Sequence, residues 1–186
     1  MKNAIQERPE DIIAYWFAVE NRDLWFKATP ARDAELKQRF ENLWEAARDS
    51  RVEHWRDTPE GCLALAIVLD QFPLNMYRGQ PASFVTQDHA IAVTRHALAN
   101  AFDARLPLEQ RAFLYMPLMH SENLDDQDES VRCFESAGLK DNLRFARHHR
   151  ELIQRFGRFP HRNAILGRGN TAEEAAYLAS EAAFRG

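Results

Sequence analysis

The sequence contains few cysteines and few glycines, only 2 and 7 among its 186 residues. It is therefore poor in residues that cross-link a chain or interrupt its secondary structure. Cys62 and Cys133 lack the spacing of a metal or redox motif, so they are predicted to be reduced packing residues rather than a disulfide. The longest uninterrupted apolar run, from Cys62 to Leu69, is too short to span a bilayer, and no hydrophobic segment stands at the N-terminus. The sequence therefore predicts a cytoplasmic protein without a membrane span or a signal peptide.

The chain also has no surplus of cations. It contains 24 Lys and Arg against 28 Asp and Glu, a formal net charge of -4. This deficit argues against a general nucleic-acid binder, which neutralises phosphates with an excess of basic side chains. The charge is unevenly distributed: from Lys140 to Arg168 there are eight Lys or Arg and two acids, so this segment carries +6 and the remainder carries -10.

Helical signals fill the sequence, and no alternating strand pattern runs longer than a few residues. Pro9, Pro30 and Pro59 stand where the first turn of a helix accepts proline, two of them directly after a threonine. The helix that begins at Pro59 is apolar nearly all round as far as Leu69, which is typical of a central, buried helix. We therefore predict an all-α protein, a compact array of about eight antiparallel helices in one domain of residues 1–186.

The sequence also predicts where several helices end and which residues they bury. Asp70 and Gln71 should lie at the end of the apolar helix, and Pro117 should stop or kink a later one. Asp141 should cap a helix that Gly157 terminates in a left-handed conformation. The residues expected to face inward on the last two helices are Phe145, His149, Leu152, Ile153, Phe156, Ala175, Leu178, Ala179 and Ala182.

Four motifs resemble a known family. In order and spacing, YWF, LDQFPLNMYRG, MPLMHSENLDDQ and RFGRFPHRNAILGRGNTAEE resemble an uncharacterised, mainly bacterial family, domain of unknown function 924. The resemblance covers nearly the whole chain. It implies a helical fold of the tetratricopeptide-like superfamily, and it carries no established activity. Leu74, within the motif LDQFPLNMYRG, stands where the family pattern has arginine, which weakens an anion-binding role for that segment.

One stretch, RFGRFPHRNAILGR at residues 155–168, concentrates arginine and aromatic side chains in a predicted loop. Guanidinium groups are planar forks that pair with carboxylate or phosphate, and glycine lets backbone amides approach a ligand closely. The next helix opens at Thr171 with capping-box spacing to Glu174, so its dipole would also favour an anion. The pattern of this arginine loop predicts an anion-receiving pocket. Its candidate residues are Arg158, His161, Arg162, Asn163 and Arg168.

A structural role is the alternative for the same arginines. The strongly acidic remainder of the chain offers many internal partners, such as Asp70, Asp88 and Glu122. Buried arginine networks often lock helix ends together without binding a ligand. The sequence leaves both interpretations open.

The segment His120-Ser121-Glu122 is the other candidate for chemistry. A histidine beside a carboxylate can shuttle protons near neutral pH, and Glu122 becomes a general base if burial raises its pKa. Asp70 is a second candidate acid or base. A His/carboxylate metal site is a further alternative, but no diagnostic spacing supports it, so no metal or cofactor is predicted. In the simplest alternative, His120 and Glu122 only bond to loop backbone or to arginine side chains.

These polar residues are expected to converge on one concave side of the helical array. The predicted catalytic set is Glu122, His120 and Asp70, and the predicted ligand-binding set is Gln71, Asn75, Arg78, Arg158, His161, Arg162, Asn163 and Arg168. The favoured function is a binding protein for an anionic small molecule or a peptide carboxylate. The alternatives are a hydrolase or proton-transfer enzyme that clamps its substrate with the arginine loop, and a purely structural polar network. Neither nucleic acid nor membrane is a predicted partner.

Overall fold

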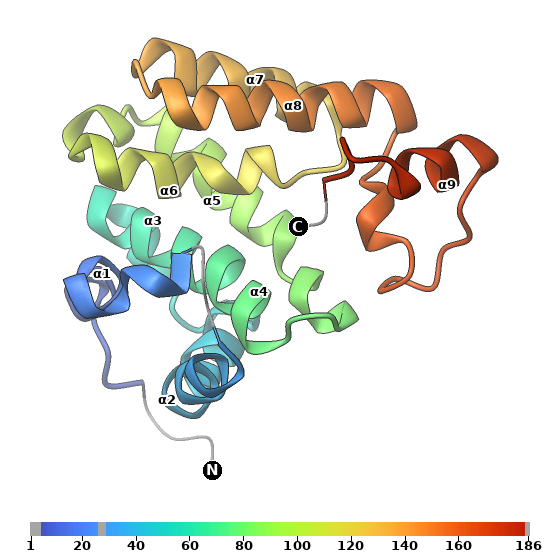
Figure 1. Ribbon diagram of the computed structural model, residues 1–186. Coiled ribbons are helices and arrows are strands. Elements are labelled where there is room, and N and C mark those ends of the chain that lie inside the picture. The colour runs from blue at the N-terminus through green and yellow to red at the C-terminus, as the bar shows by residue number, and fades with distance from the viewer. Residues whose placement is uncertain (1–4, 26–28, 185–186) are drawn as a thin grey trace. The chain divides into compact units, whose positions relative to one another are not determined.

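The computed structural model describes residues 5–25 and 29–184, and this part of the chain is helical without any β-strand (Figure 1). Short 3-10 turns connect the helices. The all-α prediction is confirmed, and the nine α-helices among the described residues are close to the predicted eight. None of these helices is both long and apolar enough to cross a bilayer. The helices are α1 (Pro9–Phe17), α2 (Pro30–Arg48), α3 (Pro59–Ala66), α4 (Phe72–Met76), α5 (Gln87–Ala99), α6 (Leu108–Met119), α7 (Leu124–Ser136), α8 (Lys140–Phe156) and α9 (Ala172–Ala179).

Contacts within the chain divide it into two compact units. Unit 1 comprises Met1–Arg78 and Ala82–Pro117, and unit 2 comprises Gly79–Pro81 and Leu118–Gly186. The chain passes from one unit to the other in the last turn of α6. The single-domain organisation and the tetratricopeptide-like arrangement stay predictions.

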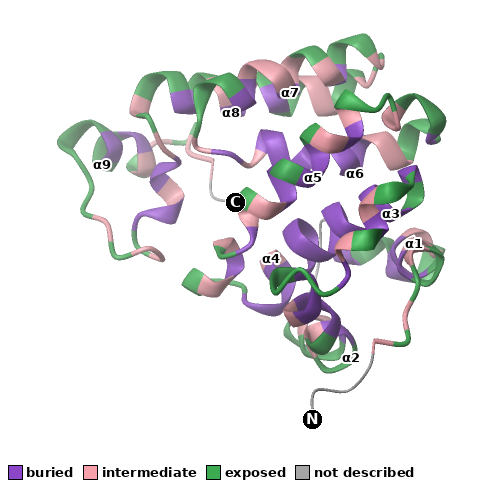
Figure 2. Cartoon of the chain, turned by 180° about the vertical axis from the view of Figure 1, so that it is seen from behind, coloured by how far each residue is buried: buried purple, intermediate pink, exposed green. Residues whose placement is uncertain are grey.

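Unit 1 is built around α3, which packs against α1 and α5, while α4 packs against α2. Every residue from Gly61 to Pro73 is buried, which confirms the predicted central helix (Figure 2). Thr29 and Thr58 cap α2 and α3 by accepting hydrogen bonds from backbone amides in the first turn of each helix. The helix starts read from the prolines are therefore confirmed for α1, α2 and α3.

The apolar helix does not end at Leu69 as predicted. Residues 67–71 form one wide turn, in which the amide of Phe72 donates to the carbonyl of Ile67, and the chain then continues as α4. Pro73 has no amide hydrogen to donate to the carbonyl of Leu69, and the hydroxyl of Thr86 donates to it instead, at 2.5 Å. Such wide turns are rare inside helices and are frequent at functional sites. Asp70 and Gln71 therefore lie inside a buried helical turn rather than at a helix end.

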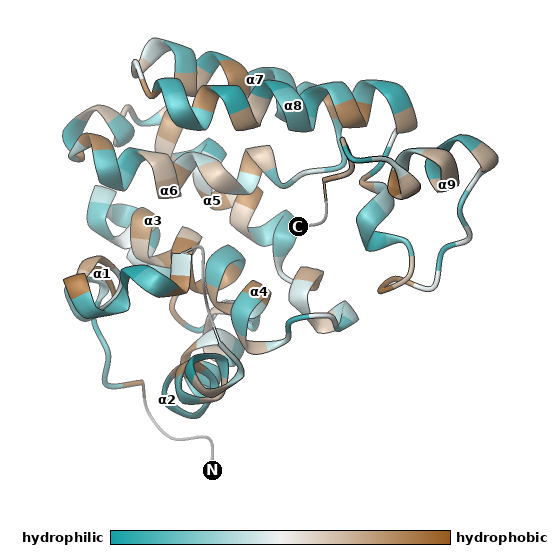
Figure 3. Cartoon of the chain, in the orientation of Figure 1, coloured by the Kyte–Doolittle hydropathy of each residue, from teal (hydrophilic) through white to brown (hydrophobic). Residues whose placement is uncertain are grey.

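Unit 2 is built on the hairpin of α7 and α8, which lie side by side (Figure 1). Hydrophilic and hydrophobic residues alternate along α8 (Figure 3), and Leu152 and Ile153 from its inner face join Phe159 and Tyr177 in a core cluster. Gly157 ends α8 with a φ of 69°, as predicted. The N-terminal cap of α8 and its buried face each differ from the prediction. Asp141 lies within the first turn, and Phe145 is 45% exposed while Ala146 is buried in its stead.

The helix α6 continues through Pro117 and ends two residues later. A side chain from α7 caps this end: the buried amide of Gln127 donates to the carbonyls of Met119 and Ser121, both at 2.7 Å. These bonds satisfy carbonyls that have no helical partner at a helix C-terminus. Gln127 therefore fixes the path of the chain into His120 and Glu122.

The last helix begins as predicted but buries a different face. Thr171 and Glu174 form the expected capping box. The prediction of an inward alanine face is wrong, because Ala175 and Ala179 are exposed while Glu174 and Tyr177 are buried. The Tyr177 ring packs 5.2 Å from that of Phe156, and the carboxylate of Glu174 is paired inside unit 2. Leu178 is partly buried and Ala182 is exposed.

Cys62 should resist thiol reagents in the folded protein, whereas Cys133 should react. Burial raises the pKa of the fully buried Cys62 thiol to about 11, and its Sγ donates to the carbonyl of Arg56. Cys133 is only partly buried. Since the thiolate is the reactive species, Cys62 should react at least about tenfold more slowly with a chromogenic disulfide reagent. Cys62→Ser assigns the slow phase, and two equally fast phases in the native wild-type protein would contradict this expectation.

Candidate functional site

The predicted site residues fall into two groups, one in each unit. Unit 1 holds Asp70, Gln71, Asn75 and Arg78, and unit 2 holds His120, Glu122, Arg158, His161, Arg162, Asn163 and Arg168. Within each unit the structure brings most of these side chains into contact, as described below. Their convergence on one concave surface stays a prediction.

The group in unit 1 is a chain of hydrogen bonds that runs from the core to the surface. The amide of Gln71 donates to Asp70 at 2.6 Å, and the amide of Asn75 donates to the carbonyl of Gln71 at 3.0 Å. Arg78 then donates to the side-chain oxygen of Asn75 at 2.7 Å and to Asp33 at 2.9 Å. Asp70, Gln71 and Asn75 are buried, while Arg78 is exposed. The sequence had not singled out Asp33, an acid of α2 that neutralises Arg78.

Glu122 and Arg168 form the central contact of the arginine loop. The guanidinium of Arg168 donates to both oxygens of Glu122, at 2.6 and 2.9 Å, and its Nε donates to Asn163 at 3.0 Å. The amide of Phe159 also donates to Glu122, at 2.8 Å. Burial disfavours the charged carboxylate, but the hydrogen bonds from Arg168 and Phe159 outweigh it and lower the pKa of Glu122. The predicted alternative in which Glu122 bonds to an arginine is therefore observed, and the hypothesis that burial raises its pKa is wrong.

A second bidentate pair fixes the other side of the arginine loop. Arg158 donates to both oxygens of Glu174, at 2.6 and 2.8 Å, and to the carbonyl of Gly169. The hydrogen bond from Arg158 is the main reason why the pKa of Glu174 is lowered to about 2. In the sequence, Glu174 stands out only as part of a capping box. No local signal marks it as the partner of an arginine 16 residues earlier.

His161 and Arg162 lie on the aromatic side of the loop. Arg162 is buried, with its guanidinium carbon 4.5 Å from the centre of the Phe159 ring. Burial, and then the charge of Arg162, lower the pKa of His161 to about 4. At neutral pH this imidazole is therefore uncharged, so it can form a hydrogen bond but adds no positive charge to an anion site.

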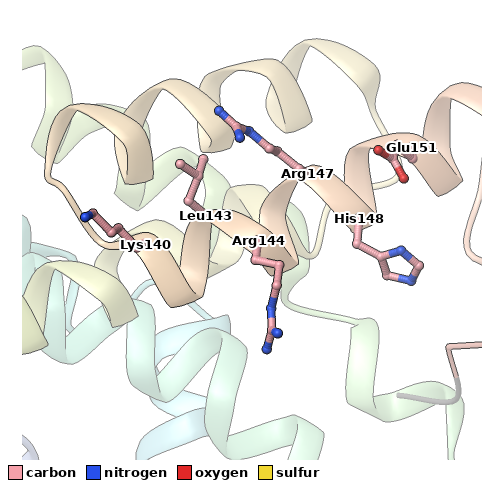
Figure 4. A pocket seen from close by; sticks show the side chains of 6 residues that line it. All are labelled: Lys140, Leu143, Arg144, Arg147, His148 and Glu151. Carbon is pink, nitrogen blue, oxygen red and sulfur yellow. The ribbon is translucent and has the colours of Figure 1, made fainter.

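A basic surface pocket lies elsewhere in unit 2, on the exposed side of α8 (Figure 4). Its volume is about 500 Å³. Within residues 5–25 and 29–184, neither Lys140 nor Arg144 forms an ion pair. In the sequence these cations stand out only as part of the basic segment, although their spacing of four residues places them on one helical face. This α8 pocket is lined by Lys140, Leu143, Arg144, Arg147, His148 and Glu151.

Comparisons with known proteins agree with the resemblance found in the sequence. The model of a bacterial protein family of unknown function, DUF924, matches residues 12–182. The chain belongs to this family. A solved structure of a protein of unknown function from Agrobacterium tumefaciens is similar to the DUF924 chain, with 34% identity and a TM-score of 0.86. The match covers 92% of the present chain and 96% of the other. No curated protein matches the sequence.

The chemistry open to this DUF924 protein follows from how its side chains are paired. The forks of Arg158 and Arg168 are directed at the protein's own carboxylates, so an external anion would have to displace Glu174 or Glu122. A carboxylate whose pKa is lowered is a weak base at neutral pH, which disfavours Glu122 as a general base. Within the described residues no group of three or more His, Cys, Asp or Glu side chains is placed to hold a metal ion.

Proposed function

We propose that this DUF924 protein is a binding protein for an acidic peptide, and that the α8 pocket is its receiving surface. The observation that carries the proposal is the pair of cations Lys140 and Arg144, which line the pocket and form no ion pair with the described residues. Cations that are not neutralised internally attract carboxylates and accelerate their encounter.

The pocket stands on a rigid support. Arg150 pairs with Asp128 of α7, and the opposite side of α8 is buried. Arg147 pairs with Glu135 at 2.7 Å, but both side chains are more than half exposed. Such a pair contributes little to stability, so Arg147 can exchange Glu135 for a ligand carboxylate at small cost.

The dimensions and chemistry of the α8 pocket favour a peptide over a small anion. From Lys140 to Glu151 the helix is about 16 Å long at 1.5 Å per residue, which exceeds the size of a single carboxylate group. Leu143 adds an apolar contact to the lining of the pocket. Glu151 repels acidic groups at the C-terminal end of the pocket, so the acidic residues of the peptide should lie towards Lys140.

In this proposal the arginine loop has a structural role in unit 2 and is not the receiving surface for the peptide. Arg158 and Arg168 each donate to both oxygens of an internal carboxylate, which favours the network interpretation for them. Ligand binding by the residues predicted from the sequence stays a prediction. The enzyme alternative has less support, because both oxygens of Glu122 accept hydrogen bonds and Asp70 accepts one from its neighbour Gln71.

Lys140→Gln/Arg144→Gln should weaken binding of a fluorescein-labelled, glutamate-rich peptide by about five- to tenfold in an anisotropy titration at low salt. The reason is the loss of two cations that contact the peptide. The wild-type affinity should fall with added salt, and the double variant should show a smaller salt dependence.

The matched control is Arg51→Gln/Arg132→Gln, which lowers the net charge by the same amount. Both arginines are exposed and form no ion pair within the described residues. The control should bind the peptide as the wild type does. Equal weakening by the two double variants would mean that only net charge matters, and an absence of binding by the wild type would overturn the proposed function.

A further inference from the structure

The end of the described chain is held against three histidines of unit 2. The ring of Phe184 lies 4.6 Å from that of His149, 5.0 Å from that of His161 and 6.0 Å from that of His148, measured between ring centres. The three pairs meet edge to face. The amide of Phe184 donates to the hydroxyl of Tyr177 at 2.7 Å. Residues 180–184, which we call the C-terminal strap, thus cover part of the core cluster through Ala183 and Phe184.

His149 is the least hydrated group beneath the strap. His149 is only 5% exposed, and neither of its ring nitrogens has a hydrogen-bond partner of ordinary geometry among the described residues. The charged or titratable groups that face it are His120, His148 and Arg162, none of which is an acid. A proton on His149 would therefore be a buried positive charge without a counter-ion, which is a costly state.

His161 lies under the same phenyl ring and has a similar environment. Its Nδ1 is buried without a hydrogen-bond partner among the described residues. The groups that face it are Arg162, Glu122, His120 and Arg168. Glu122 is the single acid in this set, and Arg168 already neutralises it.

We propose that the C-terminal strap is an acid-released cover, which closes over neutral His149 and His161 and opens when these imidazoles take up protons. The strap borders the α8 pocket at His148, which faces Phe184 and also lines the pocket, but the proposal does not depend on the ligand of that pocket. Opening would hydrate both rings and expose an apolar surface that includes Phe159 and Tyr177. An aromatic ring attracts a cation, but this gain is smaller than the cost of keeping the charge buried.

The strap is the element that can leave at the lowest cost. It follows the end of α9 and is held by ring contacts, by the bond from Phe184 to Tyr177, and by hydrogen bonds from the amide and hydroxyl of Ser180 to the carbonyl of Tyr177. The other sides of His149 are formed by its own helix α8, by Phe159, and by the end of α6 with His120, whose ring centre lies 6.4 Å away. Moving α8 or Phe159 would break the core cluster of unit 2, and the end of α6 is fixed by the hydrogen bonds from Gln127.

The direction of the pH dependence follows from the two histidines. Burial, followed by nearby positive charges, lowers the pKa of His149 to about 3 and that of His161 to about 4 in the closed form. In an open form both rings would return towards the ordinary value of about 6.5. The open form therefore binds more protons, so the closed form is fully favoured above about pH 6.5 and loses stability as the pH falls towards 4.

The test is hydrogen exchange of the full chain by mass spectrometry at about pH 7.5 and about pH 5, corrected for the intrinsic pH dependence of exchange. Exchange in the strap should be at least about tenfold faster at the lower pH, because protonation favours the open form. Peptides from α2 and α7 should keep their protection, which separates opening of the strap from unfolding.

His149→Leu/His161→Gln should abolish the acid response, whereas His54→Leu, which removes an exposed histidine of unit 1, should leave it unchanged. Phe184→Ala should give fast exchange of the strap already at pH 7.5. This variant tests the docking contact even if the double variant fails to fold. Identical corrected exchange at both pH values, or an undiminished acid response in a folded double variant, would overturn the proposal.

Discussion

Gly61→Ala should destabilise the protein by about 3 kcal/mol or more. A Cβ atom at this position would lie 1.8 Å from the carbonyl oxygen of Trp55 and 2.9 Å from the hydroxyl of Thr58. The first of these atoms belongs to the backbone, so no side-chain rotation relieves the overlap. The start of α3 would have to move away from the turn Glu53–Asp57, and Trp55 is buried in that turn. The hydrogen bond from Gly61 to the capping Thr58, at 3.1 Å, would be strained as well.

Urea unfolding followed by tryptophan fluorescence and by circular dichroism measures this loss. All four tryptophans, Trp16, Trp25, Trp44 and Trp55, belong to unit 1, where the substitution lies, and circular dichroism also reports on the helices of unit 2, where the control lies. The matched control is Gly169→Ala, since a Cβ there would meet nothing within 4 Å and the backbone of Gly169 is not left-handed. The control should stay within about 0.5 kcal/mol of the wild type. Similar unfolding midpoints for the two variants would contradict the close approach of α3 to Trp55.

Arg168→Ala should destabilise unit 2 by about 2–4 kcal/mol. Arg168 and Glu122 are each only a quarter exposed in their side chains, so the substitution leaves a largely buried carboxylate without its fork of donors. Among these donors, Glu122 would keep only the amide of Phe159 as a hydrogen-bond partner. Asn163 and the carbonyl of Phe159 would also lose a donor, which would loosen the arginine loop.

The same contact predicts a dependence on acid. Because the pKa of Glu122 is lowered in the folded protein, its contribution is complete above its ordinary value of 4.5 and is lost as the pH falls below it. Calorimetric melts of the wild type and of Arg168→Ala should therefore converge at low pH. Arg147→Ala removes an exposed pair and should cost less than about 1 kcal/mol at any pH. A melting temperature for Arg168→Ala equal to that of Arg147→Ala would refute the structural role of the pair.

Several helix starts and the end of α8 were determined by the sequence alone, whereas the continuation of the chain past Leu69 and through Pro117 was not. Thr29, Thr58 and Thr171 each accept a hydrogen bond from the amide three residues ahead, and Gly157 adopts the left-handed conformation that ends α8. These signals work because each involves residues within one turn of the chain. Family membership was also evident from the sequence, because long motifs match those of the family in the same order along nearly the whole chain.

Only the tertiary structure decided which carboxylates neutralise the arginines and which faces the last helices bury. The chain has 28 acids, and Arg168 and Arg158 select Glu122 and Glu174 from 46 and 16 residues away. The same selection draws Glu174 inward, so α9 exposes its alanines, and the packing of α8 leaves Phe145 in solvent. The physical reason is one of range. A helix cap or stop depends on residues within one turn of the chain, whereas a buried charge pairs with whichever partner the whole fold places beside it.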